Sequence, residues 1–143
     1  AAASNLKVAL YPHAGFFVAD IEDALRVVRK VDRRNVGVTF NLCHELQAGN
    51  EARFDRLLEE AAPYLSVVSI NGADHEGGWD KLIQPLGKGS FDLIRLLRKL
   101  FDVGYEGPIG LQCYQVPGDT LANLEHNMKQ WKSIVAQLAE KKR

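Results

Sequence analysis

Four short apolar runs, rich in β-branched residues, alternate along the chain with longer amphipathic segments. The runs cover about residues 6–11, 36–41, 65–70 and 108–113. Between them, and after the last one, apolar residues recur at the spacing of a helix with one buried face. Buried parallel strands have nearly continuous apolar sequences, whereas strands with one wet face alternate. The pattern therefore predicts an α/β fold built from four parallel strand-helix units.

The predicted helices have recognisable ends. Asp20 and Ser90 are each expected to cap a helix, because both side chains can accept a hydrogen bond from an N–H of the first turn. Pro63 is expected to end the helix that follows Gly49–Asn50. The last helix is expected to run from Thr120 to about Ala139. Its apolar positions form one stripe, made of Leu121, Leu124, Met128, Trp131, Val135 and Leu138.

The composition fits one globular domain over residues 1–143. The chain is 46% hydrophobic and 25% charged, which allows a buried core and differs from the composition of disordered chains. Its 18 basic and 18 acidic side chains cancel, so nucleic acid is not expected as a partner. No apolar stretch approaches the roughly 18 residues of a membrane span, so no membrane partner is expected. Cys43 and Cys113 lack metal or redox spacing, which indicates reduced thiols in a cytoplasmic protein.

Polar residues gather just after each apolar run. They are His13, His44, the acidic segment Asp74–Glu76, and Gln112–Gln115. In parallel sheets the chemistry lies beyond the carboxyl ends of the strands, so a site is expected where these groups meet. The third run leads into a polar loop, residues 71–89, of a length that is usually functional or mobile.

Four segments together carry a family resemblance: Tyr11–His13, Asn41–His44, Pro85–Asp92 and Gly104–Ile109. The last two are the most specific, because they combine a Pro-Leu-Gly-Lys-Gly turn, a helix start and a Gly-Tyr-Glu-Gly-Pro strand entry. With these segments the chain resembles the sugar phosphate isomerase/epimerase family, the xylose isomerase-like TIM barrels. The resemblance spans nearly the whole chain, but only strands five to eight of the eight-stranded barrel. It implies half of a (β/α)8 barrel that acts on, or binds, a small carbohydrate.

The resemblance also implies a divalent metal, held by a glutamate, an aspartate, a histidine and a glutamate at the ends of these strands. The matching positions here are Tyr11, Asn41, Ser69 and Gln112, so all four ligands are replaced. None of these side chains is anionic at neutral pH, and hard cations are held chiefly by anionic oxygens. We therefore expect no metal cofactor and assign no catalytic residue. The candidate ligand-binding residues are Tyr11, His13, Asn41, His44, Ser69 and Gln112.

Other polar segments have two interpretations each. The segment Asp74–Glu76 is a candidate for a separate metal site with His13 or His44, or else an ordinary polar loop tip. The turn Gly87–Gly89 precedes a helix and is a candidate phosphate cradle, or else only a turn. His126, within the last helix, is expected to be solvated.

The outer strands of a four-stranded parallel sheet would have open edges, which favour aggregation unless something covers them. A second copy of the chain, or an amino-terminal half-barrel, is expected to complete the barrel. Alternatively, the four units form a small open sheet by themselves, with the last helix folded over an edge. Three functional hypotheses follow: an isomerase or epimerase relative with an altered metal site, a noncatalytic carbohydrate-binding relative, and a structural half-barrel.

Overall fold

The protein folds around one sheet of four parallel strands. A computed structural model describes residues 1–140 of the chain. The strands are β1 Val8–Leu10, β2 Val36–Asn41, β3 Leu65–Ile70 and β4 Ile109–Leu111, and they lie in the order β1-β2-β3-β4. Each neighbouring pair is parallel. This confirms the predicted fold, in which the strand-helix units make half of a TIM barrel.

The inner strands β2 and β3 have the predicted bounds, whereas the outer strands are shorter than expected. The prediction placed strands over about 6–11 and 108–113, but β1 and β4 each have three residues. Each outer strand has one neighbour, so its length is limited by a single ladder of hydrogen bonds. The ladder between β1 and β2 runs only from the Val8–Val36 pair to the Leu10–Val38 pair.

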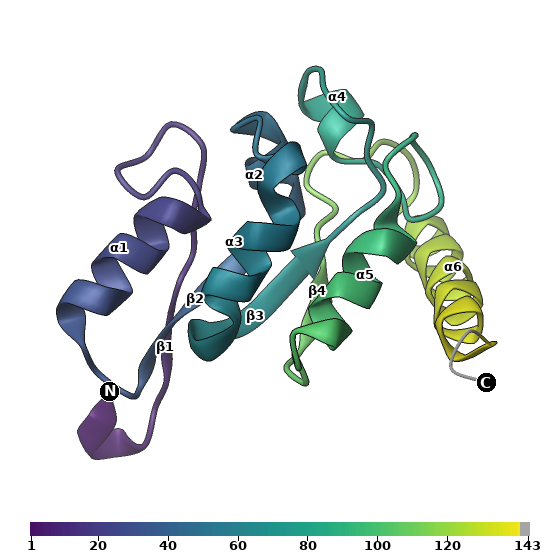
Figure 1. Cartoon of the computed structure of the whole chain (residues 1–143). Helices are drawn as coiled ribbons and strands as arrows, with labels where there is room; N and C mark the ends of the chain where they lie inside the picture. Colours follow the sequence, from purple (N-terminus) through teal and green to yellow (C-terminus); the bar gives the residue numbers. More distant parts are fainter. Residues whose placement is uncertain (141–143) are drawn as a thin grey trace.

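Helices connect the strands and follow the last one. The longer ones are α1 Ile21–Val31, α3 Phe54–Ala61, α5 Leu93–Asp102 and α6 Thr120–Glu140, and the shorter ones are α2 Leu42–Gln47 and α4 Trp79–Leu82. Single 3₁₀ turns lie at Ala2–Ser4, Glu51–Arg53 and Ala62–Tyr64. In chain order, α1, α3, α5 and α6 contact one another beside the sheet (Figure 1).

One of the two predicted helix caps is confirmed. The Asp20 carboxylate accepts a hydrogen bond from a first-turn N–H of α1. The prediction for Ser90 is wrong, because the carboxylate of Asp92 caps α5. The Ser90 hydroxyl instead donates to Asp74 at 3.0 Å. The helix α5 thus begins two residues later than predicted. Hydrogen bonds from Ser90 to Asp74 hold the preceding segment against the loop that follows β3.

Alternating side chains of the inner strands divide between two faces of the sheet. Phe40 of β2 is buried in the core, where its ring lies 5.4 Å from that of Phe54 on α3. On the other face, Asn41 of β2 is paired in register with Ser69 of β3. The core between sheet and helices therefore fixes the position of the polar residues at the strand ends.

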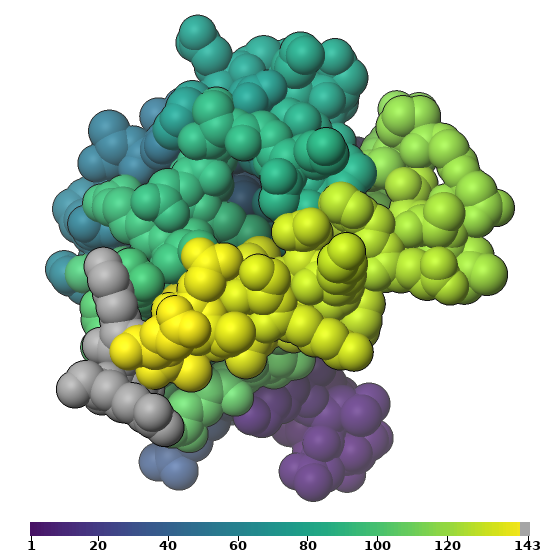
Figure 2. All heavy atoms as spheres, turned by 90° about the vertical axis from the view of Figure 1, so that its right-hand side faces the viewer, coloured from purple at the N-terminus to yellow at the C-terminus, as the bar shows by residue number. Residues whose placement is uncertain are grey.

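The apolar stripe of α6 forms as predicted, but only part of it is covered. Trp131 and Leu138 pack against the core, whereas four members stay exposed: Leu121 at 64%, Leu124 at 49%, Met128 at 54% and Val135 at 45%. Figure 2 shows α6 lying across this side of the molecule. The prediction for His126 is wrong, because its Nε2 lies 3.0 Å from the Leu86 carbonyl oxygen in a partly buried position. No helix in the described part of the chain combines the length and apolarity needed to cross a membrane.

Candidate functional site

Three of the predicted site residues meet at the carboxyl ends of the strands. Tyr11 directly follows β1, Asn41 is the last residue of β2, and Gln112 directly follows β4. The Tyr11 hydroxyl accepts a hydrogen bond from the Asn41 amide and a second one, at 3.3 Å, from the Gln112 amide. We call these three residues the strand-end cluster. The second bond joins segments that follow the two outer strands of the sheet.

The strand-end cluster leaves one hydroxyl proton available. A phenol has one donor and two acceptor lone pairs, and both acceptor positions of Tyr11 are used by amides. Burial is the main cause that raises the pKa of Tyr11, so its hydroxyl keeps its proton at neutral pH. The side chain is still 46% exposed. Tyr11 can therefore donate its O–H to a bound molecule.

Asn41 is fixed in the cluster by its surroundings. It is fully buried, and its Oδ1 accepts a hydrogen bond from the Cys43 thiol at 3.1 Å. Burial raises the pKa of Cys43 to about 11, which keeps the thiol protonated and able to donate. Ser69 lies beside Asn41 in the β-ladder, and its hydroxyl makes no hydrogen bond within residues 1–140. The fourth predicted position thus adjoins the cluster without being bonded to it.

The two candidate histidines lie close together beside the cluster, with their rings tilted by 41° and with opposite hydrogen-bonding roles. Their ring centroids are 4.2 Å apart. His44 Nδ1 accepts from the backbone N–H of Ala14 at 3.2 Å, so its ring proton lies on Nε2. His13 Nδ1 lies 2.9 Å from the Ala14 carbonyl oxygen, so here Nδ1 carries the proton and Nε2 is the acceptor. Burial, and then His13, lowers the pKa of His44 to about 4, so His44 is neutral at neutral pH.

Aromatic rings extend this arrangement on two sides. The His44 ring lies 5.3 Å from Trp79 and 5.8 Å from Tyr11, in both cases edge-on. Phe16 lies 4.6 Å from His13, also edge-on. Trp79 comes from α4, so the long loop after β3 contributes one wall of the site. The prediction that this loop is functional or mobile stays a prediction.

Glu45 is a buried carboxyl that sequence reasoning does not single out. Its side chain accepts from the Ile21 backbone N–H at 2.7 Å and from the Asn50 amide at 2.8 Å. Burial raises its pKa to about 7, with further contributions from nearby carboxylates. Glu45 holds the first residue of α1 against α2, next to His44. The only signal in the sequence was a charged residue among apolar ones, because its main-chain partner is 24 positions away.

The alternative polar segments have structural partners of their own. Asp74 accepts from the Ser90 backbone N–H and hydroxyl, both at 3.0 Å, and His75 pairs with Glu51 at 2.8 Å. In the Gly87–Gly89 turn, a Cβ on Gly89 would lie 2.0 Å from the Ala73 carbonyl oxygen. That glycine is needed for close backbone packing. Within residues 1–140, no three His, Cys, Asp or Glu side chains are grouped to hold a metal ion.

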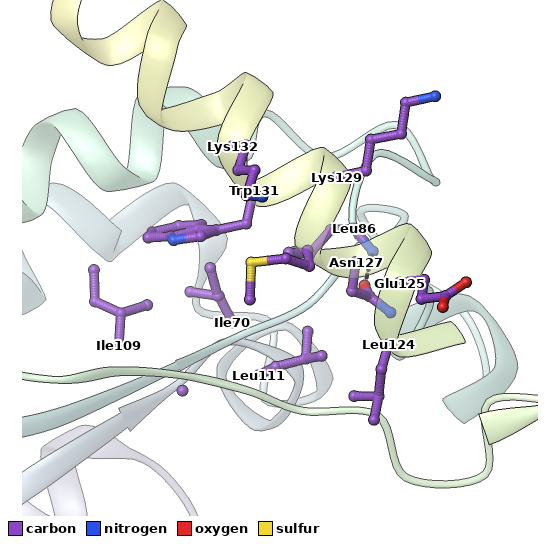
Figure 3. A pocket seen from close by; sticks show the side chains of 12 residues that line it. Ile70, Leu86, Ile109, Leu111, Leu124, Glu125, Asn127, Lys129, Trp131 and Lys132 are labelled. Carbon is purple, nitrogen blue, oxygen red and sulfur yellow. Dashed lines mark hydrogen bonds between the residues drawn. The ribbon is translucent and has the colours of Figure 1, made fainter. Parts of the chain in front are cut away.

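An apolar cavity of about 840 Å³ lies between α6 and β4 (Figure 3). It is lined by none of the six candidate residues. The lining residues Ile70 and Leu111 are the chain neighbours of Ser69 and Gln112, so β3 and β4 contribute both to the cavity and to the candidate site.

Comparison with known proteins identifies the family to which this fold belongs. Residues 1–137 match the family model of the xylose isomerase-like TIM barrel. The chain belongs to this family. An uncharacterized protein of Methanocaldococcus jannaschii is 31% identical over 91 residues, which are 64% of this chain and 30% of that protein.

Solved structures with a similar fold agree with this family assignment. The 3-keto-D-glucoside 4-epimerase from E. coli superposes with a TM-score of 0.73 at 17% identity, covering 94% of this chain and 48% of the epimerase. The family 2 AP endonuclease from Brucella melitensis superposes with a TM-score of 0.67 at 26% identity, covering 86% and 46%. The chain thus spans about half the length of these relatives, and its fold is related to that of sugar epimerases.

The family implies a divalent metal at the strand ends, and the residues present do not fit one. The four positions expected to match the ligands carry Tyr11, Asn41, Ser69 and Gln112. All four side chains are neutral at neutral pH. The amides of Asn41 and Gln112 also already donate hydrogen bonds to the Tyr11 hydroxyl. A cation at this position would meet only neutral amide and hydroxyl oxygens, with no negative charge to balance its own.

Proposed function

We propose that this half-barrel binds a carbohydrate through neutral hydrogen-bonding groups at the strand ends, without metal-dependent isomerase chemistry. The observation that carries the proposal is the double acceptance by Tyr11, which receives N–H groups from Asn41 and Gln112 and so keeps its own O–H free to donate. Family membership and the shared fold with a sugar epimerase support a carbohydrate as the ligand class.

The groups around Tyr11 are matched to hydroxyls. A sugar hydroxyl is both a donor and an acceptor, so it needs a partner of each kind. Tyr11 O–H and His44 Nε2–H are donors, whereas His13 Nε2 is an acceptor. Trp79 is 39% exposed beside His44 and offers an apolar surface to the C–H face of a sugar ring. Sites of this type combine apolar walls with a few placed polar groups.

The same groups argue against proton transfer by a carboxylate at this position. A general base at neutral pH must accept a proton in its resting state, and amides such as Asn41 and Gln112 do not. The neutral His44 uses its Nδ1 lone pair to accept the Ala14 N–H. The four strand ends themselves therefore supply hydrogen-bonding groups and no carboxylate base. The activity of a complete barrel would include groups from four further strands.

The test is ligand-observed NMR with a panel of ketoses, aldoses and sugar alcohols against wild type and Tyr11→Phe. That variant keeps the ring and removes the donor. One hydrogen bond to a ligand is worth about 1 kcal/mol, so affinity is expected to fall about fivefold to tenfold. Tyr64→Phe is the matched control, because Tyr64 lies at the opposite end of β3 from the strand-end cluster.

The outcome decides the proposal in either direction. Saturable binding that weakens in Tyr11→Phe and not in Tyr64→Phe supports it. Absence of binding across the whole panel contradicts it, and so does an equal loss in both variants. Interconversion of any sugar in the panel by wild type would replace the binding function with a catalytic one.

A further inference from the structure

Each amide of the strand-end cluster makes a second hydrogen bond, on its oxygen. The Asn41 oxygen accepts from the Cys43 thiol at 3.1 Å, while the Asn41 nitrogen donates to Tyr11. The Gln112 oxygen accepts from the backbone N–H of Tyr114 at 3.2 Å. Its nitrogen donates to Tyr11 at 3.3 Å. In both amides the nitrogen therefore faces the phenol, and the oxygen is bonded to a different donor.

The orientation of these amides decides what the Tyr11 hydroxyl can do. A side-chain amide has a donor end and an acceptor end of nearly the same shape, and half a turn exchanges them. With its nitrogen toward Tyr11, Asn41 occupies a lone pair of the phenol oxygen and leaves the O–H free. With its oxygen toward Tyr11, Asn41 would accept that O–H, and Tyr11 could no longer donate it to a bound molecule.

The group that fixes the orientation of Asn41 is a side chain, whereas Gln112 is fixed by the main chain. Within residues 1–140, the Cys43 thiol is the hydrogen-bond donor to the Asn41 oxygen. Both residues are fully buried, so bulk water does not replace the thiol in this role. Burial also raises the pKa of Cys43 to about 11, so the thiol keeps the proton that it donates.

We propose that Cys43 is a positioning residue of the candidate site, whose thiol holds the Asn41 amide in the orientation that leaves the Tyr11 hydroxyl free to donate. Donation runs in one direction, from the thiol to the Asn41 oxygen and from the Asn41 nitrogen to the phenol oxygen. Without the thiol, either orientation of Asn41 leaves one buried polar atom without its partner at position 43, so the preference between them is lost. A fraction of the molecules would then have the amide reversed.

The role of Cys43 in ligand binding rests on the function proposed above, whereas the orientation of the Asn41 amide can be measured without a ligand. The test is NMR of the full chain with ¹³C at tyrosine Cζ, and Tyr11→Phe identifies the Tyr11 resonance. In wild type, the Asn41 amide protons are expected to show stronger nuclear Overhauser effects to the Tyr11 ring than to the Cys43 β-protons. Cys43→Ala is expected to shift the Tyr11 Cζ resonance and to add effects between these amide protons and the new methyl group.

Two further variants separate hydrogen bonding from packing. Cys43→Ser keeps a donor at the same position and is expected to restore the wild-type Tyr11 resonance. Cys113→Ala is the matched control, because Cys113 is exposed and adjoins Gln112 in the chain. It is expected to leave the Tyr11 resonance unchanged. For any sugar that binds, Cys43→Ala is expected to weaken binding, by no more than the fivefold to tenfold loss expected for Tyr11→Phe.

Four results would overturn the proposal. Stronger effects from the Asn41 amide to Cys43 than to Tyr11 in wild type would show the reversed amide, and this measurement needs no variant to fold. An unchanged Tyr11 resonance in Cys43→Ala would show that other groups hold Asn41. A shift that Cys43→Ser does not reverse, or that Cys113→Ala produces equally, would assign the effect to packing. Absence of sugar binding, by contrast, contradicts the proposed function and leaves the ligand-free result standing.

Discussion

Replacing Glu45 with glutamine is expected to change how stability depends on pH. Glu45 is fully buried, and burial raises its pKa from 4.5 to about 7 in the folded protein. The folded state thus binds the proton more tightly than the unfolded chain. The stabilising contribution is complete below pH 4.5 and is lost as the pH rises through 7. The variant has no such proton to lose.

The size of the effect follows from the two pKa values of Glu45. A change from 4.5 to about 7 corresponds to on the order of 3 kcal/mol. His44 acts in the opposite direction, because its pKa falls from 6.5 to about 4 on folding. Its contribution is present above pH 6.5 and is lost as the pH falls through 4. The two effects oppose one another in the acid range, so only the difference between wild type and Glu45→Gln isolates the carboxyl.

Urea unfolding followed by tryptophan fluorescence measures this difference at about pH 5 and about pH 8. Protein concentration is held fixed, because self-association changes apparent stability. The variant is expected to gain on the order of 3 kcal/mol relative to wild type between these two pH values. The new amide faces the Asn50 amide N–H, which adds a cost of about 1 kcal/mol at both pH values. The test is therefore how the difference in free energy of unfolding between variant and wild type changes with pH, and not its value at one pH.

Glu106→Gln is the control, because Glu106 is an exposed glutamate in the turn before β4. Its profile is expected to run parallel to that of wild type. If the profile of Glu45→Gln also runs parallel to wild type, the folded protein holds no proton on Glu45 between pH 5 and 8, and the reasoning from burial fails.

Two further predictions concern the strand ends and α5. The double variant Asn41→Asp with Gln112→Glu is expected to bind about one Mn²⁺ per chain in elemental analysis after dialysis, because it restores two anionic ligands. Wild type is expected to bind none, and about one tightly held metal in wild type would refute the view that the site is altered. Asp92→Ala is expected to lower the free energy of unfolding by about 1 kcal/mol through loss of the α5 cap. A loss of that size in Ser90→Ala but not in Asp92→Ala would contradict the cap assignment.

The parallel sheet could be predicted from sequence because its inner strands are short runs of mostly apolar residues, and β2 is almost entirely buried. Residues 36–41 and 65–70 are apolar runs, and these are the observed bounds of β2 and β3. The ends of β1 and β4 depend on how far a single ladder extends, which the local sequence does not encode. The helix α2 begins directly after β2 without a turn signal, so its start at Leu42 could not be predicted from the local sequence.

The meeting of Tyr11, Asn41 and Gln112 follows from parallel order, because carboxyl ends of parallel strands share one edge. Their hydrogen-bond partners do not follow, since the residues are up to 101 positions apart. The same holds for His126, whose partner Leu86 lies 40 positions earlier in the chain. Contacts of this kind depend on the spacing of packed elements, which helical and strand periodicity leave undetermined.

The hydrogen bond between Gln112 and Tyr11 also reports the shape of the sheet. Three strand spacings separate β1 from β4, or about 14 Å if the sheet were flat, with side chains standing away from its plane. Two side chains that stand away from a flat sheet would not meet across that distance. Their contact at 3.3 Å therefore requires a curved sheet, in which the side chains on the concave face approach one another. A flat sheet could not keep this hydrogen bond, so the contact between Gln112 and Tyr11 depends on the curvature of the sheet. The four strands thus already have the curvature that a barrel requires.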